Sequence, residues 1–296
     1  MFAYHNVGVR CLKVLLAQGV EIALVLTHQD SPDENIWFES VADLCREHGI
    51  PFETPEYVSG EKGGVDHGAL WVRRLTEIAP DFIFSFYYRN MLPMTLLNTA
   101  RQGALNMHGS LLPQYRGRVP VNWAIVRGET RTGATLHYMV EKPDSGDIVA
   151  QQAVPILPDD SAHEVFGKVC VAAEIALYGV LPDLLAGTAP RRKNDLSQGA
   201  YFGGRKAEDG RIDVAQSSAQ IYNLIRAVAP PYPGAYLELA GQPALWIDGA
   251  WPVRHAEIAS LLEMQATRTV GPLLRWQGHS YLRGSDGAWL KLLLRK

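Results

Sequence analysis

The sequence predicts an α/β protein: a Rossmann-like, mostly parallel sheet with helices on both faces, followed by a small C-terminal β-barrel of the OB-like kind. Three observations predict this fold class. In residues 1–110, short apolar runs alternate with amphipathic segments, as in a doubly wound sheet. The apolar runs are continuous, which is typical of strands covered on both faces. From residue 201 onward, short strand-like runs are separated by turn residues, as in a small barrel.

The first half is predicted element by element from these runs. Apolar, strand-like runs lie at Phe2–Tyr4, Val20–Thr27, Asp81–Phe86 and Gly103–His108. Amphipathic segments predict helices at Val9–Ala17, Phe38–His48, Leu70–Ile78 and Met94–Asn98. Strands that alternate with helices in this order are expected to run parallel to one another.

The pattern changes after Thr132. Two adjacent strands, TGATLHYMV (132–140) and DIVAQQAVPI (147–156), are joined by the turn-rich EKPDSG. A long helix is expected over Ser161–Ala186. The polar stretch 191–200 is interpreted as a linker, which gives an N-terminal catalytic domain over 1–190 and a C-terminal barrel-like domain over 201–296. Further short strands are expected in the tail, among them YPGAYLELAG, PALWIDGAW, TVGPLLRWQG and HSYLRGSDGAWLKLLLRK.

Composition excludes several classes of protein. A formal net charge of −3 over 296 residues gives no overall basic surface for nucleic acid. Cys11, Cys45 and Cys170 are scattered, which matches no zinc spacing and is typical of a reducing compartment. No signal peptide is visible, and Val20–Thr27 is too short to span a bilayer. We therefore expect a cytoplasmic protein with no metal and no membrane contact.

The run LNMHGSLLPQYRGR (105–118) carries the clearest chemical signal. If a strand ends at His108, then Asn106 and His108 point to the same face, toward the crevice at the carboxyl edge of the sheet. A neutral imidazole can accept and return a proton near pH 7, and an amide can donate to an oxygen that gains negative charge. Asp144 is the candidate carboxylate to orient the imidazole, with Asp147 as its rival. Such a set suits acyl transfer to an amine.

The same residues resemble a known family. Asn-x-His, the loop Leu-Leu-Pro-x-Tyr-Arg-Gly and a later Asp are all present in NMHGSLLPQYRGRVPVNWAIVRGETRTGATLHYMVEKPDSGDIV. This combination is similar to the core of the folate-dependent formyltransferases, and the likeness extends over nearly the whole chain. FAYHNVG, FSFYYRNML and YFGGRKAEDGRID resemble most closely the branch that formylates UDP-4-amino-4-deoxy-L-arabinose in lipid A modification and polymyxin resistance.

The resemblance implies an enzyme, an N-formyltransferase with N10-formyltetrahydrofolate as donor and a nucleotide-linked aminosugar as acceptor. It implies Asn106, His108 and Asp144 as the catalytic residues. It implies donor contacts at Asn90, Met91, Leu92, Arg118, Val140, Glu141, Lys142, Pro143 and Asp144. In the same branch a dehydrogenase half accompanies the formyltransferase, so we expect either a separate dehydrogenase that supplies the substrate or an excised domain. The sequence does not decide between a monomer and a homo-oligomer.

Several alternatives remain. A methionyl-tRNA formyltransferase would carry a basic loop after the second strand, whereas the corresponding HQDSPDENIWFES has four acidic residues and no Lys or Arg. The residues favour a UDP-linked aminosugar through the resemblance, and a dTDP-linked aminosugar is the alternative that they do not exclude. A formate-releasing hydrolase would use water in place of the amine, and a folate-binding protein would leave the three groups idle. Arg116 either contacts an anionic ligand or pairs with a nearby acid.

Overall fold

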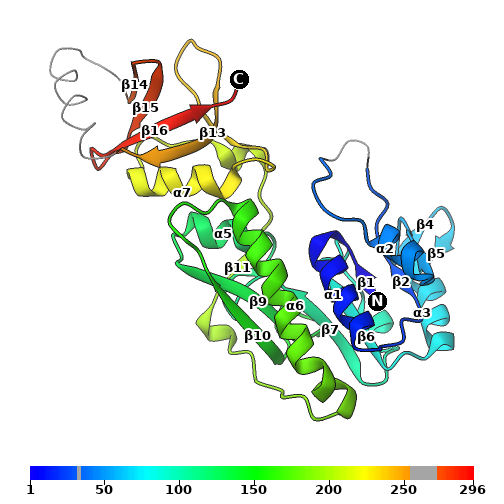
Figure 1. Cartoon of the computed structure of the whole chain (residues 1–296). Coiled ribbons are helices and arrows are strands. Elements are labelled where there is room, and N and C mark those ends of the chain that lie inside the picture. Colours follow the sequence, from blue (N-terminus) through cyan, green and yellow to red (C-terminus); the bar gives the residue numbers. More distant parts are fainter. Residues whose placement is uncertain (32–34, 254–271) are drawn as a thin grey trace. The chain divides into compact units, whose positions relative to one another are not determined.

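The computed structural model describes residues 1–31, 35–253 and 272–296 (Figure 1). It divides into two compact units, and neither is one continuous stretch of chain. The first comprises Met1–Gly117, Thr132–Val154 and Gly167–Phe202. The second comprises Arg118–Arg131, Pro155–Phe166 and Gly203–Lys296. The predicted linker, residues 191–200, ends close to the last division, between Phe202 and Gly203. Residues 118–131 and 155–166, which the prediction placed in the N-terminal domain, belong to the second unit.

A seven-stranded sheet forms the first unit, in the order β10-β9-β7-β6-β1-β2-β3. Its strands are β1 (Phe2–Ala3), β2 (Val25–Leu26), β3 (Phe52–Glu53), β6 (Phe82–Phe86), β7 (Gly103–His108), β9 (Arg131–Tyr138) and β10 (Ile148–Pro155). The strands from β7 to β3 are parallel, whereas β9 runs antiparallel to β7. The prediction of a mostly parallel sheet is therefore confirmed, and the order of strands reverses between β1 and β6.

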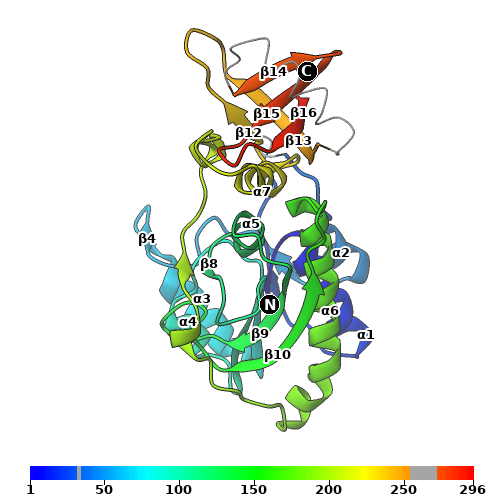
Figure 2. The ribbon, with the colours of Figure 1, turned by 90° about the vertical axis from the view of Figure 1, so that its left-hand side faces the viewer.

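Helices cover both faces of this sheet, as predicted. They are α1 (His5–Ala17), α2 (Val41–His48), α3 (His67–Ile78), α4 (Met94–Leu97) and α6 (Ala162–Ala186). Figure 2 shows α3 and α4 on one side of the sheet and α1, α2 and α6 on the other. The buried core beneath α3 and α4 includes Trp71 and Leu96, packed with Phe2 and Ile83 from the strands. Helix α2 begins after Ser40, whose side chain accepts from the Asp43 amide, and ends at left-handed Gly49.

Several first-half elements differ from their predicted bounds: α2 begins at Val41 rather than Phe38, and α3 at His67 rather than Leu70. Helix α1 begins at His5 rather than Val9, because β1 ends at Ala3 and the chain turns at once. The run Val20–Thr27 forms a strand only at Val25–Leu26, since its partner β1 is itself two residues long. Two pairs of short strands were not predicted from the sequence. Strand β4 (Glu61–Lys62) pairs with β5 (Val65–Asp66), and β8 (Arg116–Gly117) pairs with β11 (Tyr201–Phe202).

Among the described residues, α6 is long and apolar enough to cross a bilayer by length and composition. Half of its most apolar window is buried inside the protein. Helices that belong to the core of a folded protein pass the same test, so α6 is weak evidence for a membrane span.

The second unit contains a five-stranded antiparallel sheet in the order β12-β13-β16-β15-β14. Its strands are β12 (Ala235–Leu237), β13 (Leu245–Pro252), β14 (Leu273–Trp276), β15 (His279–Arg283) and β16 (Trp289–Leu294). Two helices, α5 (Pro120–Val126) and α7 (Ser218–Val228), belong to the same unit. Part of the predicted strand TVGPLLRWQG (269–278) lies outside the described residues.

Helix α7 is the main element that the sequence interpretation missed in the tail. Its first turn carries a capping box, in which Ser217 accepts from the Gln220 amide and the Gln220 side chain accepts from the Ser217 amide. Its buried face, Ile221 and Ile225, packs with Ile247 and Leu290 of the sheet. The serine and glutamine spacing was a readable signal for this helix.

Candidate active site

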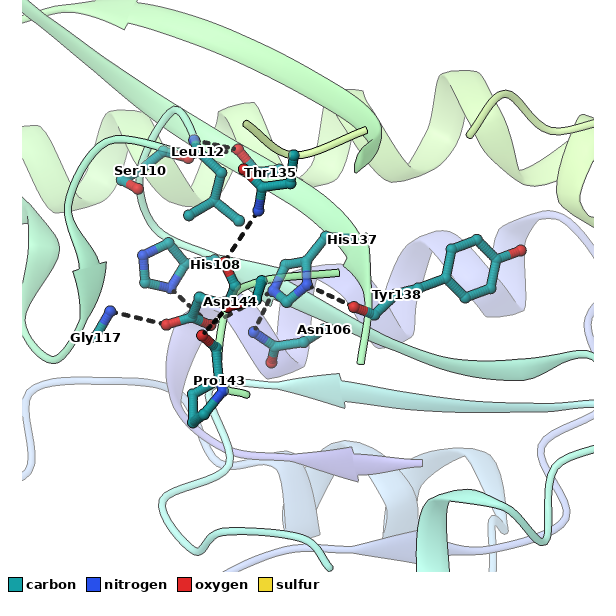
Figure 3. A network of polar contacts seen from close by, with 12 residues as sticks. Asn106, His108, Ser110, Leu112, Gly117, Thr135, His137, Tyr138, Pro143 and Asp144 are labelled. Carbon is teal, nitrogen blue, oxygen red and sulfur yellow. Dashed lines mark hydrogen bonds and ion pairs between the residues drawn. The ribbon is translucent and has the colours of Figure 1, made fainter. Parts of the chain in front are cut away.

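Strand β7 brings Asn106 and His108 to one face of the sheet, as the alternation of a strand requires. The antiparallel neighbour β9 sets His137 opposite Asn106 and Thr135 opposite His108. Figure 3 shows Asn106, His108 and His137 around the carboxylate of Asp144. Asn106 is partly exposed, whereas His108 is buried, with only 6% of its surface exposed.

Asp144 reaches this face from the turn that follows β9. Its Oδ1 lies 3.6 Å from His108 Nδ1 and 3.5 Å from His137 Nε2. Its Oδ2 accepts a 2.8 Å hydrogen bond from the Gly117 amide. The three residues singled out from the sequence therefore lie in one cluster, and Asp144 rather than Asp147 is the carboxylate that faces His108.

The tautomer of His108 follows from its partners. Nε2 lies 2.8 Å from the Tyr115 carbonyl oxygen, which can only accept, so Nε2 carries a hydrogen. In the neutral ring Nδ1 is then a free lone pair that faces Asp144. Burial lowers the pKa of His108, and the opposing charge of Asp144 and the Tyr115 carbonyl offset part of this. His108 is thus a neutral base near pH 7 with its accepting nitrogen beside a carboxylate.

Asp144 stays ionised in this environment. Burial alone would raise its pKa, but the charge of His108, the contact and charge of His137 and the Gly117 hydrogen bond together lower it to about 2. A carboxylate that is charged at every working pH stabilises an imidazolium at Nδ1. The pair can therefore hold a proton at His108 during a reaction and release it afterwards.

The place of His137 in this cluster was not predicted from the sequence. Its Nδ1 lies 2.9 Å from the Tyr138 carbonyl oxygen and therefore carries a hydrogen. In the neutral ring Nε2 accepts from Asn106 Nδ2 at 3.2 Å. This contact uses one of the two amide hydrogens of Asn106 and fixes the direction of the other. The signal for His137 was its cross-strand position, which needs the strand register.

A cavity of about 600 Å³ lies in the first unit and is lined by Tyr138 and Ser145, the residues that follow His137 and Asp144 in the chain. Its wall includes Ala104 of β7, Met139 and Val140 after β9, and Ser145 and Gly146 directly after Asp144. Arg191 also lines it, with its guanidinium carbon 3.8 Å from the centre of the Tyr138 ring. The cavity thus combines apolar walls, an aromatic ring and a cation, as small-molecule sites do.

The residues expected to contact the donor lie in different surroundings. Val140 lines the cavity, and Pro143 directly precedes Asp144 in the cluster of Figure 3. Leu92 is buried in the hydrophobic core, whereas Met91 is 68% exposed. Asn90, Glu141 and Lys142 are exposed, and Arg118 belongs to the second unit.

Arg116 was expected either to contact an anionic ligand or to pair with a nearby acid, and the structure gives it other partners. Its side chain is 6% exposed, and Nη2 donates to the carbonyl oxygens of Gly199 at 2.9 Å and Leu196 at 3.3 Å. Its recorded partners are thus backbone carbonyls of the first unit rather than an acid. Among the described residues, no group of three His, Cys, Asp or Glu side chains is placed to hold a metal ion.

Comparison with known proteins identifies the family of this chain. The family model described as formyl transferase matches residues 17–181, and the model for the formyl transferase C-terminal domain matches residues 205–266. The chain belongs to the formyl transferase family. The prediction that it is a formyl transferase is therefore confirmed.

Solved structures with the same fold include sugar N-formyltransferases. One from Helicobacter canadensis, in complex with folinic acid and dTDP-3-aminofucose, has a TM-score of 0.72 at 17% identity, over 99% of this chain and 98% of that one. WlaRD, a sugar 3N-formyl transferase studied with dTDP and 5-N-formyl-THF, has a TM-score of 0.73 at 17% identity, over 99% and 96%. A 4-N formyltransferase from Francisella tularensis has a TM-score of 0.62 at 20% identity, over 83% and 95%. At such identities the likeness establishes the fold.

Proposed function

We propose that the protein transfers the formyl group of N10-formyltetrahydrofolate to the amine of a nucleotide-linked aminosugar. UDP-4-amino-4-deoxy-L-arabinose is the first candidate acceptor. The observation that carries the proposal is the convergence of His108, Asn106 and Asp144 on one face of the sheet beside a cavity. A base, an amide donor and a carboxylate are the groups that formyl transfer to an amine requires.

Each of the three groups has a defined task. His108 Nδ1 takes a proton from the attacking amine and returns it to the donor nitrogen as the carbon–nitrogen bond to the folate breaks. The unshared amide hydrogen of Asn106 is donated to the formyl oxygen, which gains negative charge when the amine adds. Asp144 stabilises the imidazolium that exists between the two proton transfers. General acid–base catalysis of this kind contributes about 10²- to 10⁴-fold, and one oxyanion donor about 3 to 4 kcal/mol.

The donor is proposed to occupy the cavity beside Met139, Val140 and Ser145. A pterin is flat, with polar edges, and needs apolar contact on its faces and hydrogen bonds at its rim. The residues that line the wall include apolar Leu97 and Ala104 and polar Ser145 and Asp147, which suit these two needs. In the similar structures from Helicobacter canadensis and of WlaRD, folate derivatives are present in the crystal.

The acceptor is proposed to lie at the carboxyl ends of β1 and β6, where the order of strands reverses. Ligands of open α/β sheets bind at this point. The residues that follow β1 and those before α2 bring aromatic rings together: His5 stacks on Phe38 with centroids 4.0 Å apart and meets Trp37 edge-on at 4.6 Å. The guanidinium of Arg89 lies 4.5 Å from the Tyr4 ring. Rings suit a nucleotide base, and a guanidinium suits its phosphates.

A dTDP-linked aminosugar is the second candidate, because two of the similar structures contain dTDP or a dTDP-sugar. Transfer to charged initiator tRNA is disfavoured by the sequence of residues 28–40, whose four acidic residues repel phosphates. Residues 32–34 of that stretch lie outside the described residues. A cytoplasmic site of action and supply of the substrate by a separate dehydrogenase remain part of the proposal.

The decisive experiment incubates the protein with N10-formyltetrahydrofolate and a panel of UDP- and dTDP-linked aminosugars, and detects formylated product by mass spectrometry. Product with an aminosugar nucleotide is the expected result, and it should disappear in His108→Gln. Formate released at the same rate without any acceptor would instead identify a hydrolase. Formylation of charged initiator tRNA, with no sugar product, would reverse the choice of acceptor.

A further inference from the structure

A segment that the sequence suggested was a simple linker lies directly against the catalytic cluster. Residues 192–202, here called the brace, belong to the first unit. The brace contacts the loop Pro113–Gly117, which carries the Tyr115 carbonyl and the Gly117 amide, and it also contacts Asp144. The loop thus contacts both His108 and Asp144, and the brace contacts Asp144 and the loop.

On the carboxylate side the contact is made by Asn194. This side chain is buried at 4% exposure, and its Nδ2 donates to the backbone carbonyl of Asp144 at 3.0 Å. Asp144 itself has a left-handed backbone with φ of 52°. Such a conformation costs a non-glycine residue free energy and persists only where surrounding contacts hold it. Asn194 supplies one of those contacts, from a position fifty residues further along the chain.

On the imidazole side the contact is made by Arg116. Its guanidinium donates to the carbonyls of Leu196 and Gly199, and its backbone amide donates to the Ala200 carbonyl at 3.2 Å. A buried guanidinium is tolerated only when hydrogen-bonded, so these carbonyls fix the loop firmly. The adjacent Tyr115 is also left-handed, with φ of 56°, and its ring stacks on Phe202 of the brace at 5.0 Å. The Tyr115 carbonyl, which selects the tautomer of His108, is held in place by these contacts.

The two backbones approach so closely that one position of the brace must be glycine. A Cβ on Gly199 would lie 2.1 Å from the Pro113 carbonyl oxygen and 3.1 Å from the Gln114 amide nitrogen. Gly199 has an extended backbone, so the requirement is steric and not a matter of its own dihedral angles. A methyl group here would force the brace away from the loop.

We propose that the brace is a positioning element for the catalytic pair, with Asn194 and Arg116 as positioning residues. The brace holds the Tyr115 carbonyl against His108 Nε2 and the Asp144 carboxylate against Nδ1, so that the accepting nitrogen of His108 is Nδ1. The expected effect of the brace on catalysis rests on the proposed function. The assignment of the tautomer rests on the geometry alone and can be tested without any substrate.

The test compares Asn194→Ala and Gly199→Ala with the full-length wild type and with Gly203→Ala. Gly203 is the matched control, because it lies close in sequence, has no strained backbone and has no atom within 4 Å of an added Cβ. Histidine labelled with ¹⁵N reports the tautomer of His108, whose signal is assigned by its loss in His108→Gln. Thermal unfolding establishes that each variant is folded. Should Gly199→Ala fail to fold, Asn194→Ala, which leaves the glycine contact in place, carries the test.

In wild type and Gly203→Ala we expect His108 to be a single Nε2–H tautomer at neutral pH. In the folded brace variants we expect a mixture of His108 tautomers. Once the acceptor is identified, we expect kcat to be at least tenfold lower than in wild type, with the KM for the donor changed less than threefold. Folded variants that keep the single tautomer and the wild-type kcat would overturn the proposal. A wild type that formylates no aminosugar refutes the proposed function, while the tautomer measurement still decides the role of the brace.

Discussion

At the scale of single residues, the site depends on which nitrogen of His108 bears a proton. The Tyr115 carbonyl accepts from Nε2, which therefore carries a hydrogen, and Asp144 Oδ1 lies 3.6 Å from Nδ1. The same carboxylate faces His137 at 3.5 Å, and His137 in turn orients Asn106. Four side chains are therefore coupled, so removal of any one of them changes more than a single contact.

Asp144→Asn keeps the shape of the side chain and removes its charge. Because the carboxylate offsets the lowering of the His108 pKa by burial, we expect that pKa to fall further in the variant. We expect kcat to drop by about 10²- to 10⁴-fold, with a smaller change in KM for the donor. Asp147→Asn is the matched comparison from the same turn, and equal losses of kcat in the two variants would contradict our choice of carboxylate. Steady-state kinetics across pH measures both effects.

Titration of His108 also affects the stability of the fold. Its pKa in the folded protein is lowered from 6.5, so the unfolded chain binds more protons just below pH 6.5. Stability therefore rises with pH through this window and is lost as pH falls below 6.5, by at most about 1.4 kcal/mol per pH unit. Asp144, lowered to about 2, contributes stability above its unfolded value of 3.8 that is lost as pH falls toward 2.

Denaturant unfolding between pH 5 and 7 tests the histidine effect, with the range chosen around its ordinary pKa of 6.5. In His108→Gln we expect a smaller slope of unfolding free energy against pH than in wild type. An unchanged slope in His108→Gln would show that His108 is not held neutral by burial.

At the scale of elements, glycines distinguish close backbone packing from open helix surface. Gly133 lies in β9, where an added Cβ would be 2.1 Å from the Gln152 carbonyl oxygen and 2.7 Å from a methyl carbon of Leu111. Gly167 lies inside α6 with nothing within 4 Å of an added Cβ. The first glycine permits β9 and β10 to lie side by side, whereas the second only weakens its helix.

Paired alanine substitutions should therefore have opposite signs. Gly133→Ala overpacks β9 against β10 and should lower the free energy of unfolding by about 1 to 3 kcal/mol. Gly167→Ala restricts the unfolded chain and should raise it by about 0.5 to 1 kcal/mol. Chemical denaturation of the two variants measures both. Stabilisation by Gly133→Ala would mean that β10 does not approach β9 as closely as this structure has it.

At the scale of the whole molecule, the chain crosses between its two units more often than its sequence suggests. Residues 118–131 and 155–166 belong to the second unit although they lie within the predicted N-terminal domain. Asn122, at 6% exposure, donates to the Ala227 carbonyl at 2.7 Å, and Arg226 donates to the Asp160 carbonyl at 2.9 Å. Both contacts lie within the second unit.

A piece that ends at residue 202 should therefore fold poorly. It would retain α5 but lose α7, leaving Asn122 without its acceptor and Val126 without the core of α7 and the second sheet against which it packs. We expect a lower melting temperature than that of the full chain and increased binding of a hydrophobic dye. A 1–202 piece that melts at the temperature of the full chain would instead support a self-contained N-terminal domain.

Local patterns in the sequence determined much of this protein. The alternation of apolar and amphipathic segments predicted the parallel sheet and its covering helices, since strand and helix periodicity are properties of neighbouring residues. The spacing of Asn106 and His108 placed both on one face for the same reason. The family followed from these residues together with the loop after them. The capping box of α7 was equally local and could have been read.

Contacts between distant residues were decided only by the tertiary structure. The register of β9 against β7 brings His137 beside Asn106, and no spacing along the chain states that register. Asp144 was named from the sequence by resemblance, but only the structure shows that its carboxylate faces His108. The brace pairs residues about eighty positions apart through backbone carbonyls, which every residue possesses and which therefore leave no mark in a sequence.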